Sequence, residues 1–405
     1  VLVEEYLLKI ESKINKEISK GKKRFGDSFD ENEFKSTNPR VLKYSKKHKE
    51  ISNILGELLS SSDLKGLAEL INELEINDPI SGTSNWTDVK QFNLMFATKL
   101  GASADSAMNL FLRPETAQGI FVNFLNVQKT GRMKLPFGIA QTGKAFRNEI
   151  VARQFIFRMR EFEQMEMQFF IPPGSQKEWY THWKEKRLQW HLALNMRQEN
   201  YRFHDHDKLA HYADAACDIE FKFPFGFKEL EGIHSRTDFD LGNHEKFSGK
   251  KLQYFDPEKN INITPFVLET SIGLDRMFLA VFSNALQEET LDNNTTRIVL
   301  KIPPFLAPTK VAILPLVKKD GLPALANEIV DQLKWDFAIN YDEKDALGRR
   351  YRRQDALGTP FCITVDHQSL DDNTVTLRNR DSMKQERVAI SALSLIHISE
   401  PTRPY

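Results

Sequence analysis

The chain has 405 residues, with 56 basic and 56 acidic side chains that cancel. A chain of this length exceeds one hydrophobic core, so two or three domains are expected. Zero net charge excludes recognition of nucleic acid by bulk charge, so any RNA contact must come from local basic patches. The composition, 40% hydrophobic and 28% charged, is that of an ordinary globular protein.

The cysteine count and the hydropathy of the chain indicate the cellular compartment in which the protein is expected. The two cysteines, Cys217 and Cys362, lie far apart in the sequence. This spacing excludes a disulfide framework and a zinc knuckle, and it favours a reducing compartment. No apolar run approaches the ~18 residues of a membrane span, and no signal-peptide pattern opens the chain. We therefore expect a cytoplasmic protein without a membrane partner and, because it starts at Val1 without a methionine, a fragment.

Residues 1–78 are lysine-rich and have the period of amphipathic helices. Apolar side chains recur at helical spacing in two stripes, Tyr6, Leu7, Ile10, Ile14 and Ile18, then Ile51, Ile54, Leu55, Leu58 and Leu59. Between the stripes, residues 21–40 are polar and rich in turn-forming residues, so we predict a loop there. The stretch 78–85 is predicted to be a domain boundary.

Residues from about 86 to 302 carry dense strand signals, and a proline-rich segment at 303–308 forms a second boundary. Beyond it, strand patterns at 311–316, 361–365 and 374–378 alternate with a helix pattern at 322–333. This alternation predicts a small α/β domain over residues 304–392. Residues 393–405 resemble the translated read-through of a common sequencing adapter, so we predict a non-native tail; the alternative is a short natural tail.

The most informative stretch joins Phe146–Glu149, through a short polar loop, to Phe157–Phe169. Read as a strand, its period of two places a polar set on one face, namely Arg158, Arg160, Phe162, Gln164, Glu166 and Gln168. The other face carries the side chains suited to packing, namely Met159, Met165, Met167 and Phe169. A preceding strand at 139–149 should pair with it in antiparallel fashion, with Arg147 and Glu149 pointing to the same side.

A face with two arginines, an aromatic ring and a glutamate fits the wall of a polar pocket. Guanidinium groups bind phosphate oxygens in a bidentate fork, and Phe162 offers a surface for an adenine. The alternative is a solvated sheet face with scattered ion pairs.

A second polar stretch, Pro265–Leu279, reads as a strand that ends in a turn and a helix. Glu269 and Ser271 lie near the strand end, Gly273 permits the turn, and Arg276 falls in the first turns of the helix. A cation there would add to the anion-binding tendency of a helix N-terminus. A salt-bridged helix start is the alternative.

Two other patterns are interpreted as decoys. Gly138–Lys144 matches the start of a P-loop, but Ala145 replaces the Ser or Thr that reaches magnesium, and a strand pattern follows instead of a helix. The histidines and aspartates of 204–207 could suggest a metal site, but they lie in a polar, loop-like segment near His211. Surface histidines explain that cluster without a metal.

Taken together, the motifs resemble the class II aminoacyl-tRNA synthetases. Residues 146–149 followed by 158–166 look like motif 2 of that family, and residues 265–276 look like motif 3. The glycine-specific branch is suggested by four further segments, residues 112–119, 211–213, 218–226 and 229–238. The resemblance implies an α+β fold, with a helical insertion at 1–78, an antiparallel-sheet catalytic domain at 79–303 and an anticodon-binding domain at 304–392.

The resemblance also implies roles for individual residues. Those implied to bind ATP are Arg147, Asn148, Glu149, Phe157, Arg158, Phe162, Glu229, Leu230, Gly273, Asp275 and Arg276, with Arg147 and Arg276 catalytic. Those implied to bind glycine are Glu115, Phe162, Glu166, Arg236, Glu269 and Ser271. Magnesium would enter with ATP near Glu229 and Glu269, and no zinc or tightly bound organic cofactor is expected. Contacts to tRNA(Gly) are implied for Arg153 and for the basic run Arg349, Arg350, Arg352 and Arg353.

The implied reaction is ATP-dependent ligation of glycine to tRNA(Gly) through a glycyl-adenylate, in a homodimer. Motif 1, which builds the dimer interface in this family, should lie upstream of Val1. The homodimer is therefore expected of the complete protein, and neither dimerisation nor activity is predicted for this chain alone. One alternative is a non-catalytic relative that binds nucleic acid as an accessory subunit, although such relatives tend to lose the ATP-gripping arginines. Another is a synthetase for threonine or proline, whose pocket would need side-chain recognition groups.

Overall fold

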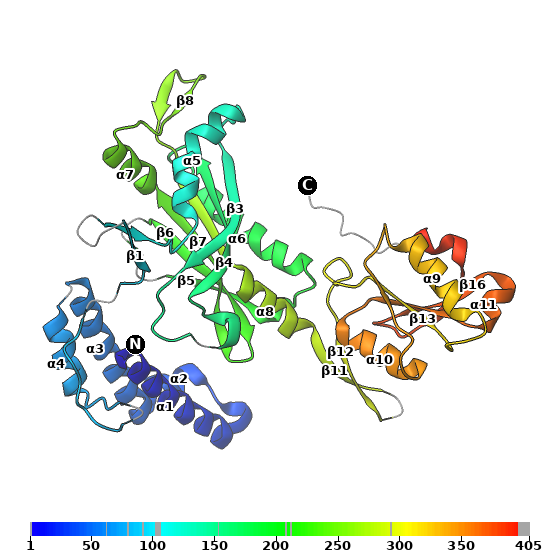
Figure 1. The fold of residues 1–405 in the computed structure, drawn as a ribbon. Helices are drawn as coiled ribbons and strands as arrows, with labels where there is room; N and C mark the ends of the chain where they lie inside the picture. Colours follow the sequence, from blue (N-terminus) through cyan, green and yellow to red (C-terminus); the bar gives the residue numbers. More distant parts are fainter. Residues whose placement is uncertain are drawn as a thin grey trace. The chain divides into compact units, whose positions relative to one another are not determined.

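The computed structural model describes residues 2–395 apart from 62, 79–80, 91–92, 102–106, 153, 207–208, 211–212 and 292–293. The predictions made for Arg153, Asp207, His211 and residues 396–405 fall outside this set. The chain divides into two compact units, Val1–Asn93 and Leu94–Tyr405, which are described separately (Figure 1).

The first unit consists of helices α1 (Leu2–Phe25), α2 (Glu31–Thr37), α3 (Pro39–Ser60) and α4 (Leu64–Glu73), with a 3₁₀ turn at Gly26–Ser28. Both predicted apolar stripes contribute to its core. The buried residues there are Val3, Ile10, Ile51 and Leu70, and partly buried side chains such as Ile14 and Leu55 pack against them. The helical prediction for this region is confirmed.

The loop predicted at residues 21–40 is wrong, because its turn-forming residues cap helices. Asp30 accepts hydrogen bonds from the Asn32 and Glu33 amides at the start of α2. Asn38 does the same for α3, where Pro39 occupies the first helical position. Gly21 lies inside α1, where a Cβ would come within 2.8 Å of the Phe29 and Phe34 rings. Its lack of a side chain lets those rings pack closely on the helix.

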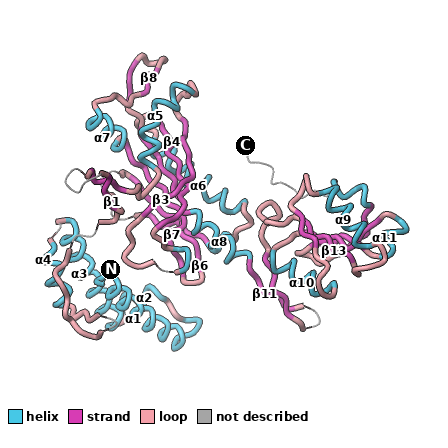
Figure 2. Tube along the Cα trace, in the orientation of Figure 1, coloured by secondary structure: helices cyan, strands magenta, loops and turns pink. Residues whose placement is uncertain are grey.

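The second unit contains a six-stranded antiparallel sheet in the order β3-β4-β10-β7-β6-β5. Figure 2 draws its strands in magenta. Its strands are β3 (Phe137–Phe146), β4 (Glu161–Ile171), β5 (Tyr201–Asp205), β6 (Ala215–Phe223), β7 (Gly226–Thr237) and β10 (Phe266–Gly273). The predicted antiparallel pair is β3 with β4. Because the P-loop-like segment Gly138–Lys144 lies within β3, it forms no phosphate-binding turn.

Helices α5 (Ala117–Thr130), α6 (Gln176–Ala193), α7 (Phe239–Ser248) and α8 (Leu274–Ala285) accompany this sheet. Phe121 and Phe124 of α5 form a core with Phe137 and Phe170. The predicted apolar face of β4 meets α6 through Phe169, whose ring lies 4.9 Å from that of Trp179. Met165 and Met167 also pack as expected. Met159 does not, because it precedes the strand.

The remaining elements of this part are short. Three two-stranded hairpins are β1 (Ala97–Leu100) with β2 (Met108–Phe111), β8 (Tyr254–Asp256) with β9 (Ile261–Ile263), and β11 (Leu286–Thr290) with β12 (Thr296–Leu300). 3₁₀ turns occur at Phe155–Phe157 and Gln198–Asn200. His204 and Asp205 lie in strand β5, so the loop predicted for this histidine segment is wrong.

The C-terminal part is the expected α/β domain, built on a five-stranded sheet in the order β14-β13-β15-β16-β17. Its strands are β13 (Val311–Pro315), β14 (Ile339–Tyr341), β15 (Phe361–Val365), β16 (Thr374–Asn379) and β17 (Gln385–Ala389). Its helices are α9 (Leu322–Leu333), α10 (Leu347–Leu357) and α11 (His367–Asp372), followed by a 3₁₀ turn at Ile390–Leu395. Leu393, which the sequence assigned to the tail, is buried in this domain's core.

These elements confirm the α+β class, with an antiparallel sheet followed by a mixed α/β domain. Within the described residues, no helix combines the length and apolar character needed to cross a membrane.

Gly358 ends α10 with a φ of +83°, and a Cβ there would lie 3.0 Å from Ile302 Cδ1. We expect Gly358→Ala to lower the free energy of unfolding by about 1–3 kcal/mol, because it adds both left-handed strain and overlap. Urea denaturation measures this change. Gly348→Ala is the matched control, since a Cβ on Gly348 of the same helix meets no atom within 4 Å. Equal stability of the two variants would contradict the prediction.

Candidate active site

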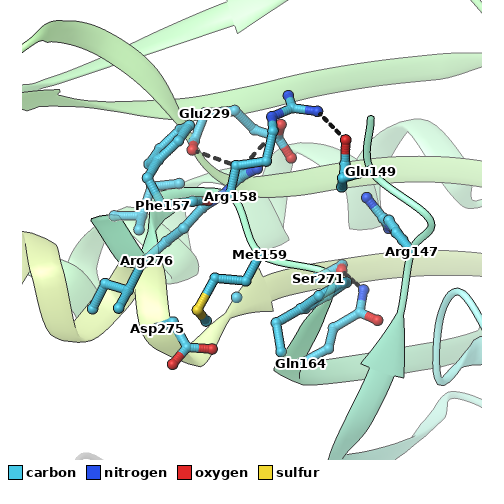
Figure 3. Close-up of a pocket in the computed structure, with 14 residues that line it drawn as sticks. Arg147, Glu149, Phe157, Arg158, Met159, Gln164, Glu229, Ser271, Asp275 and Arg276 are labelled. Carbon is cyan, nitrogen blue, oxygen red and sulfur yellow. Dashed lines mark hydrogen bonds and ion pairs between the residues drawn. The ribbon is translucent and has the colours of Figure 1, made fainter. Parts of the chain in front are cut away.

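A pocket opens where the end of β3, the start of β4, β7 and the β10–α8 junction meet. Its lining residues are Arg147, Glu149, Ile156, Phe157, Arg158, Met159, Phe162, Gln164, Glu229, Leu230, Ser271, Gly273, Asp275 and Arg276 (Figure 3). The register of β4 against β10 brings the two polar stretches of the sequence together, because Gln164 lies opposite Gly273 and Glu166 opposite Ser271.

A β-bulge directs one glutamate into this pocket. In the pairing of β6 with β7, Ile219 faces Glu231 and Glu220 faces Glu229, so Leu230 has no partner. The extra residue reverses the alternation of side chains along β7. Glu229 therefore lines the pocket, while Glu231 is buried against α6 and accepts hydrogen bonds from Arg187.

The buried carboxylate of Glu231 links the face of β7 opposite the pocket to helix α6. Burial acts to raise its pKa, but the hydrogen bond from His191 and the charge of Arg187 outweigh burial and leave the pKa below its usual value. An ionised Glu231 thus ties β7 to α6 on the side opposite Glu229.

Two arginines lie over two rings in the pocket. The Arg147 guanidinium is 5.3 Å from the centre of the Phe162 ring, and that of Arg276 is 4.3 Å from the centre of the Phe157 ring. Backbone oxygens fix both side chains: Arg147 Nε donates to the Pro114 oxygen at 3.1 Å, and Arg276 Nε donates to the Phe157 oxygen at 3.1 Å. The arginines are therefore held before any ligand enters.

Two ion pairs and one backbone hydrogen bond hold the carboxylates of the pocket lining. Arg158 Nη1 lies 3.0 Å from Glu149 Oε2, and Arg276 Nη1 lies 3.1 Å from Glu229 Oε2 (Figure 3). Asp275 accepts a hydrogen bond from the Glu163 amide at 3.3 Å. An anionic ligand that binds Arg158 would free the carboxylate of Glu149, and one that binds Arg276 would free that of Glu229. The freed carboxylate could then accept hydrogen bonds from the ligand or bind a cation.

A buried polar network lies deeper along the same strands. Gln168 Nε2 donates to Glu166 at 3.0 Å and to Glu269 at 2.7 Å. Arg236 donates to Glu269 at 3.1 Å, and two further nitrogens donate to Asp240. Carboxylates from β4 and β10 thus share donors in a region closed to water.

The two glutamates of this network have opposite pKa shifts. Burial and the nearby charge of Glu269 raise the pKa of Glu166 to about 8, against the lowering effect of the Thr116 hydroxyl. Burial also acts to raise the pKa of Glu269, but His234 and Arg236 outweigh it and hold this pKa at about 2. Glu269 is therefore the fixed anion of the pair, and Glu166 is the group that titrates near neutral pH.

Helix α5 supplies the remaining contacts of Glu166. The Thr116 amide donates to Glu166 Oε2 at 3.0 Å at the N-terminus of this helix, and the Thr116 hydroxyl also donates there. Glu115, the residue before Thr116, accepts a hydrogen bond from Gln118 at 3.2 Å. The segment at 112–119 thus adjoins the network through the backbone amide and the hydroxyl of Thr116.

Gln164 lines the pocket but was not among the predicted ligands. Its amide nitrogen donates to the Ser271 hydroxyl, while its Oε1 is buried without a hydrogen-bond partner among the described residues. A buried acceptor left open in a pocket wall is suited to a ligand donor. The strand period had placed Gln164 on the polar face between Phe162 and Glu166, and this position was the available signal.

The structure brings together the predicted ATP-binding residues with one exception. All of them line the pocket apart from Asn148, whose backbone amide donates to the Leu94 oxygen. Of the predicted glycine-binding residues, Phe162 and Ser271 line the pocket. Glu166, Arg236 and Glu269 belong to the buried network, and Glu115 lies at its edge.

The predicted magnesium pair is not brought together. Glu269 lies opposite His234 on β7, five residues from Glu229. Because the bulge at Leu230 takes up one of these residues, about four strand steps of about 3.4 Å, or roughly 14 Å, separate the two positions. The Glu269 carboxylate is also fully engaged by Arg236, His234 and Gln168. The carboxylates that line the pocket are Glu149, Glu229 and Asp275, and a cation held by one of them would take its other ligands from phosphates and water. Among the described residues, no group of three or more metal-ligating side chains is found.

The predicted tRNA-binding arginines lie on α10, and the structure separates them. Arg350 is 2% exposed and donates to the backbone oxygens of Pro315, Leu316 and Asp342, so its assignment to phosphate is wrong. The assignment failed because a helix has several faces, and this arginine is on the one that packs.

The other α10 arginines reach the surface to different extents. Arg353 pairs with Asp342 and Asp345, Arg352 donates to the Thr296 oxygen, and Arg349 is exposed.

Comparison with known proteins agrees with this arrangement. The family description "Glycyl-tRNA synthetase insertion domain 1" matches residues 1–94, "tRNA synthetase class II core domain (G, H, P, S and T)" matches residues 98–285, and "Anticodon binding domain" matches residues 310–396.

Curated relatives named glycine–tRNA ligase are similar over most of the chain. The chain is 54% identical to the relative from Chlorobaculum tepidum over 80% of its own length and 69% of that protein. It is 51% identical to that of Staphylococcus haemolyticus, over 86% of the chain and 75% of the relative. It is 54% identical to that of Borrelia hermsii, over 76% of the chain and 70% of the relative. With its class II core and the pocket described above, the chain belongs to the glycine–tRNA ligase family of class II aminoacyl-tRNA synthetases.

Proposed function

We propose that this pocket activates glycine with ATP and that the chain transfers the glycyl group to tRNA(Gly). The observation that carries the proposal is the position of the fixed arginines Arg147 and Arg276 beside a buried carboxylate network. The arginines suit phosphate groups, and the carboxylates suit an ammonium group. A non-catalytic accessory subunit would have no need for both sets at one place.

The first step forms the adenylate. A carboxylate oxygen of glycine attacks the α-phosphorus of ATP, and the bond to the departing pyrophosphate breaks. The carboxylate is already a nucleophile at neutral pH, so no general base is needed, and positioning with charge neutralisation supplies most of the rate. We assign neutralisation to Arg147, with Arg158 and Arg276 toward the outer phosphates.

Glycine would lie on the Ser271 and Gln164 side, with its ammonium group toward Glu166. Phe162 offers a ring for the adenine, with the Arg147 guanidinium 5.3 Å from the ring centre. Phe157 is buried between Arg276 and the rings of Phe223 and Phe225 and supports the pocket wall. Magnesium bound to ATP would neutralise phosphate charge, and Glu149, Glu229 and Asp275 are the carboxylates of the pocket lining that would be available to it. In the second step, a terminal hydroxyl of tRNA attacks the glycyl carbonyl, and AMP leaves.

We extend the proposal to the tRNA contacts, the oligomeric state and the cellular compartment of the enzyme. Arg349, Arg352 and Arg353 on α10 are the candidates for anticodon-side phosphate contacts. The family resemblance supports a homodimer, which sedimentation would measure. Cys217 and Cys362 are both free and buried, which fits the cytoplasm.

Glycine-dependent exchange of pyrophosphate into ATP tests the proposal directly. We expect exchange with glycine and none with alanine or serine, because the pocket is expected to leave no room for a β-carbon. Arg147→Ala and Arg276→Ala should each lower the exchange rate by about 10² through lost charge stabilisation. Arg202→Ala is the control, since Arg202 on β5 pairs with Glu220 on β6, and neither residue lines the pocket. Exchange that is independent of glycine would refute the assignment.

The Glu166 pKa of about 8 predicts a pH-dependent affinity for glycine. The ionised carboxylate attracts the ammonium group, so its protonation below pH 8 should raise the KM for glycine, by up to about tenfold per pH unit. Steady-state exchange kinetics between pH 6.5 and 8.5 measure it. Glu166→Gln should flatten the profile. A flat glycine KM in the unmodified enzyme would contradict the prediction.

Gln164→Met keeps the side-chain volume but removes the open acceptor. We expect the KM for glycine to rise roughly tenfold or more, as for a lost hydrogen bond to a charged group. The KM for ATP in the same variant serves as the internal control and should stay within about twofold. A parallel rise of both constants would mean that the substitution distorts the pocket instead of removing a glycine contact.

A further inference from the structure

A buried cluster of charged side chains fastens the β11–β12 hairpin to the C-terminal domain. The side chains of Arg297 on β12 and Asp355 on α10 are 1% and 0% exposed. Arg297 Nη1 lies 2.9 Å from Asp355 Oδ2 and also donates to the Arg380 backbone oxygen at 3.0 Å. One guanidinium thus joins the hairpin to two separate segments of the domain.

Both partners of this contact are oriented by further bonds. Arg378 on β16 donates to both carboxylate oxygens of Asp355, at 2.7 and 3.0 Å. On the hairpin side, Arg297 Nε donates to Glu289 at 2.7 Å, and Glu289 also pairs with Lys301. Arg352 adds a contact from α10 to the Thr296 oxygen at 3.0 Å. The charges alternate, so each ion has an opposite partner.

The hairpin is also continuous with the helix that carries Arg276. α8 ends at Ala285 and β11 starts at Leu286. The Lys301 amide donates to the Ala285 oxygen at 2.8 Å. Ala285, Leu300 and Ile302 are buried together. A short packed block therefore lies between the pocket helix α8 and the cluster on α10.

The chemistry of this contact is better suited to fixing the orientation of α10 against the hairpin than to adding stability. Buried ion pairs contribute little net stability compared with apolar packing, because their desolvation is costly. They do impose direction, since a guanidinium fork binds a carboxylate in a limited set of geometries. An apolar contact at the same place would tolerate sliding of α10 along the hairpin.

We propose that Arg297, Asp355 and Arg378 act as positioning residues for tRNA. By fixing α10 to the block that continues from α8, they let a tRNA bound at the C-terminal domain present its acceptor end to the pocket. This inference rests on the proposed ligase function. It assigns the cluster to the transfer step with intact tRNA and gives it no part in glycine activation.

The test compares Arg297→Lys with the unmodified enzyme in three reactions. These are glycine-dependent pyrophosphate exchange, charging of intact tRNA(Gly), and charging of an acceptor-stem minihelix that lacks the anticodon. Lysine keeps the charge but loses the fork. We expect kcat for intact tRNA to fall roughly tenfold, because small misplacement of reactants is costly. The KM for tRNA, exchange and minihelix charging should stay within about twofold.

Two further variants separate positioning from folding. Glu289→Gln weakens the hold on Arg297 from a partly exposed position, and we expect a smaller loss of the same kind. Arg387→Lys is the control, because Arg387 pairs with Asp366 and Asp372, both inside the C-terminal domain. The proposal is overturned if intact tRNA and minihelix charging fall together, or if Arg297→Lys changes neither.

Hydrogen–deuterium exchange gives a readout that needs no catalysis. We expect Arg297→Lys to raise exchange in β12 and α10 while the β13 and β15 amides stay protected. Unchanged protection at β12 and α10 would also overturn the proposal. If the unmodified enzyme shows no glycine-dependent pyrophosphate exchange, the ligase function fails, whereas these protection data still decide whether the cluster fixes the contact.

Discussion

The candidate site depends on one strand pairing, that of β4 with β10. Its register places Gln164 opposite Gly273, Glu166 opposite Ser271 and Gln168 opposite Glu269. Because neighbouring strands lie about 5 Å apart, these pairs meet across the sheet although about a hundred residues separate them in the chain. A shift by one residue would send every one of these side chains to the opposite face. The register is therefore the constraint on which both the pocket and the buried network rest.

Along this pairing, the polar face changes character from the pocket inward. Near the strand ends, Arg147 and Arg276 are held by backbone oxygens and face open space. Deeper in, Glu166 and Glu269 share Gln168 in a region closed to water. Positive groups thus lie where phosphates can enter, and negative groups lie where a small ammonium ion can be enclosed. That separation suits one strand face to an anionic group at the pocket end and an ammonium group at the buried end.

Much of this could be predicted from the sequence because short-range periodicity determines which side chains share a face. The alternation from Arg158 to Gln168 predicted the polar face and the antiparallel partner strand. Other features depend on contacts that periodicity does not encode. The bulge at Leu230, which separates Glu229 from Glu231, requires knowledge of the partner strand. Residues 21–40 contain Asp30 and Asn38, whose preference for turns is equally a preference for helix caps.

Helix α10 shows why a basic run in a sequence does not determine a function. Arg350 is buried and donates hydrogen bonds to three backbone oxygens. Arg352 contacts the hairpin, and Arg353 pairs with two aspartates. Only the helical period, combined with the identity of each neighbouring element, assigns these different tasks to adjacent arginines. The same helix contributes Asp355, the buried partner of Arg297. The exposed face, the core contact and the hairpin contact share the eleven residues of one helix. A displacement of the exposed face must therefore also act on the hairpin, and so on the block that continues from α8.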